Sequence, residues 1–210
     1  MAHASPVYRV VGKPGEQHFQ LQSKFIPELT LRIPTDVDIT AVIEILKNKA
    51  NSEFDKSISD ATAEELQLIA QRWTMVNEPL THMNFLVRHK EQPLGVAGLG
   101  WIGPANINDA SCQAERAAAA GVMLQPLGRG KGYAYEALRV VFDYGIRELG
   151  LVEIRVGSHS GNLPMKGLME KKFRLQPEAR VEESVDQFGN DLLWIMKREE
   201  WLRTIDYGGR

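Results

Sequence analysis

Apolar and polar positions along the chain follow two spacings, and each spacing predicts one type of element. Residues 29–33 and 152–156 alternate between apolar and polar side chains, as half-buried strands do. Residues 132–149 instead repeat apolar side chains every three or four positions, which is typical of an amphipathic helix. The apolar positions of that helix are Ala134, Leu138, Val141, Phe142, Gly145, Ile146 and Leu149.

The same two spacings predict the remaining elements. Further strands are expected at 83–89, 94–102, 114–125, 179–185 and 192–197, and further helices at 37–49, 62–76, 163–172 and 198–204. Polar loops are expected at 51–59 and 104–113. In chain order this gives β-α-α-β-β-β-α-β-α-β-β. That order predicts one α/β sheet with helices on both faces.

The two ends of the chain show less pattern. Residues 1–28 have little periodicity and are expected to form an extended N-terminal arm, in which 7–11 could form a short strand. Residues 29–204 are expected to form a single domain, which leaves 205–210 as a C-terminal tail.

Composition narrows the classes of function. The 210 residues, 43% hydrophobic and 25% charged, are typical of a soluble globular domain. A net charge of −2 gives no support for a nucleic-acid partner. No run approaches the roughly 20 apolar residues of a membrane span, and the N-terminus lacks a signal-peptide core, so no membrane partner and a cytoplasmic location are expected. Cys112 is the only cysteine, which excludes an intrachain disulfide, and no metal site is expected.

A glycine-rich loop carries the clearest candidate chemistry. Gly128, Gly130 and Gly132 stand at every second position between the predicted strand and the long helix. The first turn of a helix offers unpaired N–H groups and a partial positive charge, so this loop predicts an anion site, with phosphate as the usual occupant. Arg129 and Lys131 add positive charge. The alternative is that the glycines form only a tight turn and the two cations are solvated.

Two common phosphate motifs do not fit this loop. A P-loop requires Ser or Thr after its lysine, but Gly132 follows Lys131. The dinucleotide fingerprint requires Gly or Ala where Tyr133 or Tyr135 stands. The hexapeptide from Arg129 to Ala134 instead resembles the acyl-CoA pyrophosphate signature [Q/R]-x-x-G-x-[G/A] of the GCN5-related N-acetyltransferases, the GNAT superfamily.

Three further stretches resemble the RimJ/RimL-like branch of this superfamily. Residues 31–38 are similar to its L-R-x-P-T-x-x-D opening, 132–138 to its G-Y-A-x-E-A-L helix start, and 198–201 to its closing R-E-E-W. The resemblance covers residues 29–201, which is most of the chain. It implies the GNAT fold, with a mixed, mostly antiparallel central sheet that splays apart between its fourth and fifth strands.

The resemblance also implies a reaction and a set of site residues. Acetyl-CoA is the implied co-substrate, and the acceptor is a primary amine of a small molecule or a protein N-terminus; the chain would act as a monomer or homodimer. Amides from 130–134 would hold the pyrophosphate, and residues 122–124 would pair with the pantetheine arm. A backbone amide near Met123 would stabilise the oxyanion while the amine attacks the thioester directly. The implied cofactor-binding residues are Val122, Met123, Leu124, Arg129, Gly130, Lys131, Gly132, Tyr133, Ala134 and Asn162.

The sequence departs from the family pattern at the chemical step. At four positions the family often has, in order, a glutamate, a serine, a tyrosine that protonates the leaving thiolate, and a glycine. In this sequence these positions are Ala119, Met165, Met169 and Lys172. An ammonium group must lose a proton before it attacks, so a base or a water chain is expected. Glu115 and His159 are the remaining catalytic candidates. For Glu115 the favoured alternative is an exposed surface charge, and His159 could equally be a loop residue that caps the next helix.

Three questions stay open at this level. Trp101 could line a substrate cleft or act only as a packing residue. The missing acid and base also suit a different class of protein, a CoA-binding sensor or scaffold without turnover. Transfer of a longer acyl chain is a third hypothesis, which depends on the depth of the pocket.

Overall fold

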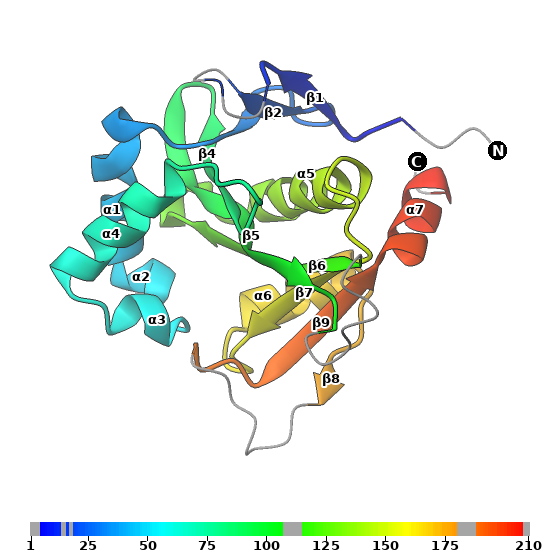
Figure 1. Cartoon of the computed structure of the whole chain (residues 1–210). Coiled ribbons are helices and arrows are strands. Elements are labelled where there is room, and N and C mark those ends of the chain that lie inside the picture. Colours follow the sequence, from blue (N-terminus) through cyan, green and yellow to red (C-terminus); the bar gives the residue numbers. More distant parts are fainter. Residues whose placement is uncertain (1–4, 14–15, 17–18, 107–114, 180–187, 208–210) are drawn as a thin grey trace.

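The computed structural model describes residues 5–13, 16, 19–106, 115–179 and 188–207 (Figure 1). Cys112, most of the predicted loop at 104–113 and most of the predicted strand at 179–185 lie outside these residues. Within the described part of the chain, no helix is long and apolar enough to cross a membrane.

A single mixed sheet forms the centre of the molecule. Its described residues give nine strands in the order β1-β2-β3-β4-β5-β6-β7-β9-β8. All neighbouring strands run antiparallel except β6 and β7, which are parallel, so the predicted mixed and mostly antiparallel sheet is confirmed. The strands are β1 Tyr8–Val11, β2 Gln20–Ser23, β3 Leu29–Arg32, β4 Met83–His89, β5 Gln92–Pro104, β6 Arg116–Leu124, β7 Glu153–Ser158, β8 Glu178–Ala179 and β9 Leu192–Lys197.

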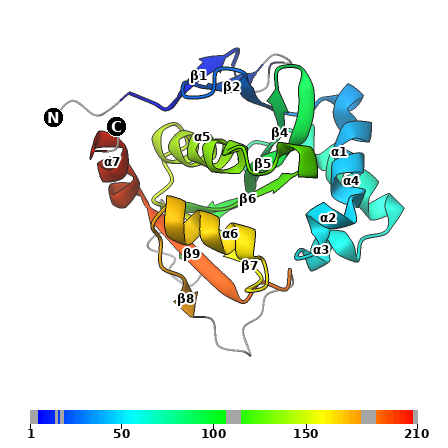
Figure 2. The same cartoon turned by 180° about the vertical axis from the view of Figure 1, so that it is seen from behind.

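Helices cover both faces of this sheet, as predicted. Helices α1 and α4 pack against Leu86 and Val96 on one face, whereas α5 packs on the other face against residues such as Phe85 and Val87. In Figure 2, α5 and α6 lie in front of the sheet while α1–α4 gather at its side. The helical segments are η1 Asp36–Asp38, α1 Ile39–Lys47, α2 Lys49–Ser52, α3 Lys56–Ser59, α4 Ala63–Trp73, η3 Pro126–Gly128, α5 Tyr133–Arg147, α6 Leu163–Gly167, the π-helical turn η4 Leu168–Lys172, and α7 Arg198–Tyr207.

The ends of the chain are more ordered than the sequence predicted. The stretch 1–28, expected as an extended arm, contains β1 and β2, which continue the sheet beyond β3. The helix predicted at 198–204 extends further, because α7 continues to Tyr207. The domain limits of 29–204 therefore stay a prediction, with sheet strands on their N-terminal side.

The region 51–59 was predicted as a polar loop and is instead mostly helical. It contains the end of α2 and the whole of α3. Asn48 and Asp55 cap these short helices, since their side chains accept hydrogen bonds from the amides of Ala50 and Ser57. Helices of four residues have too little hydrophobic periodicity to be recognised in a sequence.

Strands β6 and β7 separate along their length. They pair only from Ala117–Glu153 to Ala119–Arg155, whereas β6 stays paired with β5 up to Leu124. The last residues of β6 therefore have a sheet neighbour on one side only. This is the predicted splay, and it opens toward the glycine-rich loop.

Buried carboxylates join α5 to the two ends of the chain. Asp143 is fully buried and accepts hydrogen bonds from the Val7 amide, Arg147 Nε and the Trp201 indole at 2.8, 2.7 and 2.9 Å. Glu136 is also buried and accepts a hydrogen bond from the Ser23 hydroxyl at 2.6 Å. The helix that follows the glycine-rich loop is thus fixed by segments from both ends.

Candidate functional site

The glycine-rich loop turns sharply so that it presents free amides at the start of α5. Gly130 and Gly132 have φ angles of 73° and 81°, a region that favours glycine, and a Cβ added at either would meet no atom within 4 Å. The first amide of the helix that donates within the protein is that of Glu136, to the Gly132 carbonyl at 3.1 Å. Within the described residues, the amides from Gly130 to Tyr135 have no protein acceptor. This geometry suits a bound diphosphate.

Arg129 has a structural role that the sequence did not indicate. Its Nε donates to the Leu124 carbonyl at 2.9 Å, and its Nη2 donates to Ala50 O and Asn51 Oδ1, both at 2.7 Å. The side chain therefore fastens the end of β6 to α2. Because all three acceptors are neutral, its positive charge still acts on the loop. Lys131 and Gly132 are exposed beside it.

The register of β6 decides which of its backbone groups are free. Gln125 donates to the Leu94 carbonyl at 2.8 Å, so by alternation Met123 also directs its amide toward β5. The amides of Val122 and Leu124 point the other way, into the gap beside β7. The Leu124 carbonyl in that gap is already taken by Arg129. An oxyanion amide at Met123 itself is therefore not available, and the amides of Val122 and Leu124 are.

A cavity of about 410 Å³ lies between α1–α4, the exposed face of β4–β6 and the start of α6. It reaches the gap between β6 and β7, because Val122, Gly157 and Asn162 line it together. Much of its lining is aromatic or aliphatic. These residues are Leu46, Phe54, Ile58, Ile69, Trp73, Val96, Trp101 and Phe188. A larger hollow of about 830 Å³ between η4, β9 and α7 contains none of the residues predicted for the site.

The cavity contains very little charge. Of the described residues that line it, Asp55 is the only one with an ionisable acid or base, and its carboxylate also caps α3 through Ser57. Asn84 on β4 and Asn51 on α2 contribute polar side chains. Sequence reasoning did not single out Asp55, Asn84, Phe54 and Trp73, since they come from three separate parts of the chain and form no motif. It did consider Trp101 as a cleft residue, and Trp101 lines the cavity.

Asn162 and His159 lie on the far side of the gap from β6. Asn162 begins α6, where its Oδ1 accepts a hydrogen bond from the Met165 amide at 3.1 Å; its amide nitrogen remains for the cavity. His159 is exposed, and its ring stacks on Phe54 with centroids 5.9 Å apart. A hydrogen bond from the Ser160 hydroxyl lowers the pKa of the nearby Asp191. An ionised carboxylate therefore stands close to His159, just outside the cavity.

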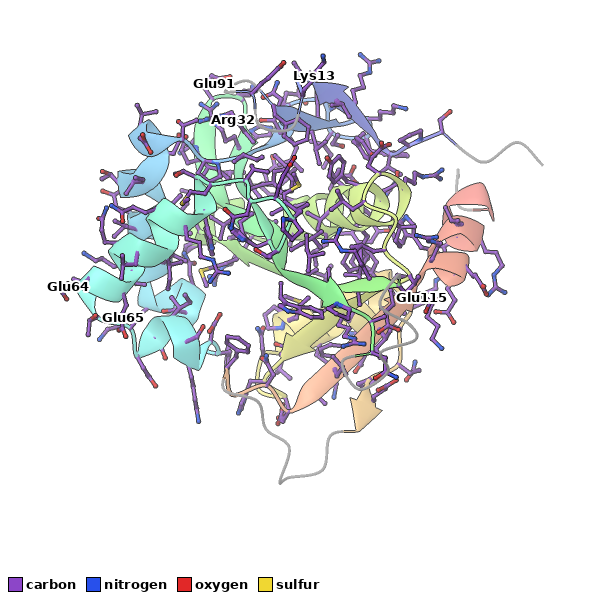
Figure 3. All side chains as sticks on the ribbon, in the orientation of Figure 1. Lys13, Arg32, Glu64, Glu65, Glu91 and Glu115 are labelled. Atoms are coloured by element: carbon purple, nitrogen blue, oxygen red, sulfur yellow. The ribbon has the colours of Figure 1, made fainter. Side chains whose placement is uncertain are left out.

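Glu115 lies apart from the other predicted site residues. It is exposed, it precedes the end of β6 opposite to the glycine-rich loop, and it does not line the cavity. Figure 3 shows it on the side of α7, far from α1–α4. Its catalytic role stays a prediction that this position does not support. Tyr133 and Ala134 are half-buried at the start of α5, where the ring of Tyr133 stacks on His89.

The positions that depart from the family pattern are now placed. Ala119 and Met165 line the cavity, so the carboxylate and hydroxyl that the family often has there are replaced by apolar groups. Met169 is fully buried in the core, and Lys172 is exposed. Of these four residues, only Lys172 carries an ionisable group, and it does not line the cavity.

Comparison with known proteins identifies the family. A family model described as an acetyltransferase (GNAT) domain matches residues 28–172. The chain belongs to this family. The predicted GNAT resemblance is confirmed, and the matched residues include the glycine-rich loop and Asn162. Among curated proteins, no sequence match was found.

Solved structures with this fold include acetyltransferases with coenzyme A bound. RimL, a ribosomal L7/L12 alpha-N-protein acetyltransferase in complex with coenzyme A, is 16% identical with a TM-score of 0.67, over 83% of this chain and 98% of that one. Mycobacterium smegmatis RimJ in complex with CoA-disulfide is 15% identical with a TM-score of 0.67, over 87% and 90%. MccE, the Microcin C7 self immunity acetyltransferase, in complex with acetyl-CoA and AMP, is 16% identical with a TM-score of 0.63, over 84% and 96%. At these identities the likeness concerns the fold.

No group of His, Cys, Asp or Glu side chains suited to a metal ion occurs among the described residues. The groups that could bind a ligand at this site are the free amides of the loop and the free edge of β6. Both match what a diphosphate and an extended amide chain require.

Proposed function

We propose that this GNAT-family protein transfers the acetyl group of acetyl-CoA to a primary amine in a ternary complex. The observation that carries the proposal is the continuity of three features. Free amides from Gly130 to Tyr135 suit the pyrophosphate, the free edge of β6 at Val122 and Leu124 suits the pantetheine amides, and the apolar cavity lies beyond that edge. Acetyl-CoA, when bound, supplies a thioester carbonyl that is activated toward amines.

The residues of the chain position the reacting groups. The amides of Val122 and Leu124 face the gap, so one can pair with the pantetheine chain while the other donates to a carbonyl oxygen that gains negative charge. A neutral amine in the cavity adds to the thioester carbonyl and forms the new C–N bond. The C–S bond then breaks as the carbonyl forms again, and CoA leaves as its thiolate. The amine proton passes to water and the thiolate takes up a proton. No covalent bond to the protein is needed.

The site offers few groups for general acid–base catalysis. Asp55 is the only carboxylate among the described cavity residues, and His159 stacks on the outer side of Phe54. We therefore expect the rate to depend on how much of the acceptor is already deprotonated. Turnover should rise with pH up to the pKa of the free acceptor amine, and acceptors with less basic amines should react faster at neutral pH.

Thiol release from acetyl-CoA, measured with a panel of primary amines, tests the proposal. Amine-dependent release, with the N-acetylated product identified by mass spectrometry, is the expected result. Tight CoA binding in calorimetry without turnover on any amine would instead favour the sensor or scaffold. Acetyl-CoA compared with longer acyl-CoA substrates tests the third hypothesis, because the cavity volume limits the chain that fits.

The location and assembly of the protein stay predictions. A cytoplasmic enzyme would find acetyl-CoA and reduced CoA at hand, which suits a reaction that releases a thiol. Cell fractionation and light scattering would decide the location and distinguish a monomer from a homodimer.

A further inference from the structure

Asn84 is a polar residue for which the fold provides no partner. Its side chain is buried, with 8% of the residue exposed, and its Nδ2 has no hydrogen-bond partner among the described residues. A buried amide that makes no hydrogen bond lowers stability, so such groups are rare unless something outside the protein completes them. Asn84 also lines the cavity.

The pairing of the strands places this amide in one row with the part of β6 that borders the gap beside β7. Asn84 pairs with Gly98 on β5, and Gly98 pairs with Gly121 on β6, so the three residues form one row on the same face. Strands lie about 4.8 Å apart, which puts Asn84 roughly 10 Å from β6. The two glycines leave this row without side chains between Asn84 and β6.

The amide lies over that bare row. A Cβ added at Gly98 would come within 2.9 Å of Asn84 Oδ1 and 2.6 Å of its Cα, so the glycine leaves room for this side chain. At Gly121 an added Cβ would meet nothing within 4 Å. The space between the Asn84 amide and the free edge of β6 is therefore open to a small molecule.

The surroundings limit what that molecule can be. Phe54, Trp73 and Trp101 line the cavity, which suits an apolar body of aromatic or branched shape. Asp55 is the only charged residue among the described lining, so a carboxylate on the acceptor would meet repulsion and no cation. Asn84 Nδ2 requires a hydrogen-bond acceptor, and the carboxylate of Asp55 disfavours a negatively charged one. A neutral carbonyl oxygen meets both requirements.

We infer that Asn84 is a specificity residue for the acceptor, and that the acceptor is an apolar primary amine carrying one neutral carbonyl oxygen. This inference rests on the proposed acetyl transfer. Asn84 Nδ2 donates to the carbonyl, the apolar body packs between the aromatic residues, and the amine is held near Val122 and Leu124. Asn84 is a positioning residue and exchanges no proton.

Two amines with the same body test this role. Phenylalaninamide carries the carbonyl, and 2-phenylethylamine lacks it. The measured quantity is the ratio of kcat/KM for the two amines, in the unmodified protein and in Asn84→Leu. Because both proteins meet the same two amines, the difference in amine basicity cancels. We expect the variant to lower this ratio about 10- to 100-fold, mainly by raising KM for phenylalaninamide.

The stability of the variant separates binding from structure. Leucine has the same branching pattern as asparagine, and its bulkier methyl groups would have the open row above Gly121 beside them. Because the change removes a buried polar group without a partner, Asn84→Leu should keep or raise the melting temperature. A structural asparagine would show a clear fall instead. Gln22→Leu is a matched control, since Gln22 is a side-chain amide on β2, away from the cavity, and bonds to Pro27 O. It should leave the ratio unchanged.

The charge requirement has its own comparison. Phenylalanine differs from phenylalaninamide by a carboxylate in place of the carboxamide, and should be the poorer acceptor. Asp55→Asn keeps a residue that caps α3 well and should reduce this discrimination about three- to tenfold.

Each failure has a distinct meaning. If none of these amines is acetylated while other primary amines of the panel are, the inferred acceptor is wrong and acetyl transfer stands. If no amine at all is acetylated while CoA still binds, the proposed function fails. If amines are acetylated but the kcat/KM ratio stays the same in Asn84→Leu, or the variant loses stability, the role of Asn84 is wrong and acetyl transfer stands. If phenylalanine reacts as well as phenylalaninamide, the requirement for a neutral oxygen is overturned.

Discussion

The two ends of the site are built from different parts of the protein. At the cofactor end, consecutive residues supply backbone amides, from Gly130 to Tyr135, and the positive φ angles of two glycines aim them. At the acceptor end, side chains such as Phe54, Trp73 and Trp101 come from α4, β5 and the segment between α2 and α3. One end depends on local backbone shape, and the other depends on tertiary packing.

This difference explains how the two ends can vary. A backbone site tolerates changes of side chain but not of conformation, so it keeps a recognisable pattern of glycines. A side-chain site changes its ligand whenever one lining residue changes, without disturbing the sheet beneath. We expect substitutions at the two ends to affect affinity for acetyl-CoA and affinity for the amine separately.

The largest expected effect is at the cofactor end. Gly132→Glu introduces a side chain at a φ of 81° and a negative charge where the pyrophosphate would lie, and should weaken acetyl-CoA binding by about 100-fold or more in calorimetry. Gly150→Glu is a matched control, because Gly150 also has a positive φ, 69°, but lies beyond the other end of α5. Undiminished affinity in Gly132→Glu would show that the loop does not bind the diphosphate.

The second largest effect is expected when the buried carboxylate on α5 is removed. This change tests whether the hydrogen bonds of Asp143 hold α5, the helix that follows the glycine-rich loop, in place. Asp143→Ala leaves the Val7 amide, Arg147 and the Trp201 indole without their acceptor, and should lower the free energy of unfolding by about 3–5 kcal/mol in chemical denaturation. Glu148→Ala is the control, at the residue that directly follows α5. Glu148 is exposed and accepts a hydrogen bond from Tyr8 at 3.2 Å, so its removal should have a far smaller effect.

A substitution at the acceptor end should change KM for the amine without changing the affinity for CoA. Gly100→Leu adds a side chain to the cavity lining at a position where a Cβ meets no atom within 4 Å, and should raise KM for the amine about tenfold or more while calorimetry shows unchanged CoA affinity. Gly167→Leu is the control, since Gly167 also has open space but does not line the cavity. A parallel loss of CoA affinity in Gly100→Leu would mean that the two ends are not separable.

The smallest effect is expected at Glu115. The sequence made it a candidate base, but it is exposed and does not line the cavity, so Glu115→Gln should change kcat by less than about twofold between pH 6 and 9. A steady-state pH profile measures this. A large fall in kcat, with CoA affinity intact, would restore Glu115 to the mechanism.

The sequence was most informative where one element determines its own structure. The alternation at 29–33, the helical spacing at 132–149 and the glycines at 128–132 led directly to β3, α5 and the phosphate loop. The strand β1 was recognised with less certainty because its residues do not alternate in burial as those of β3 do: Tyr8 is buried and the next three are exposed. The helix α3 was not recognised because its four residues are about one helical turn, which is too short to show a repeat.

The acceptor end could not be predicted for a similar physical reason. Asn84 looks like any polar residue in a strand, and only the pairing with Gly98 shows that its amide is buried beside a cavity. The role of Arg129 was incomplete for the same reason, since its acceptors Ala50 and Asn51 lie 79 and 78 residues away in the sequence. Contacts of this kind arise from the fold as a whole.

The position of Asp143 also bears on how the protein is made. Its three partners come from its own helix, from Val7, 136 residues earlier, and from Trp201, 58 residues later. During synthesis the carboxylate lacks its indole donor until the last helix has emerged from the ribosome, and until then water must solvate it. The hydrogen bonds that hold α5 in place are therefore completed late in synthesis. A nascent chain that ends before Trp201 should be cleaved by proteases more readily than one that includes it.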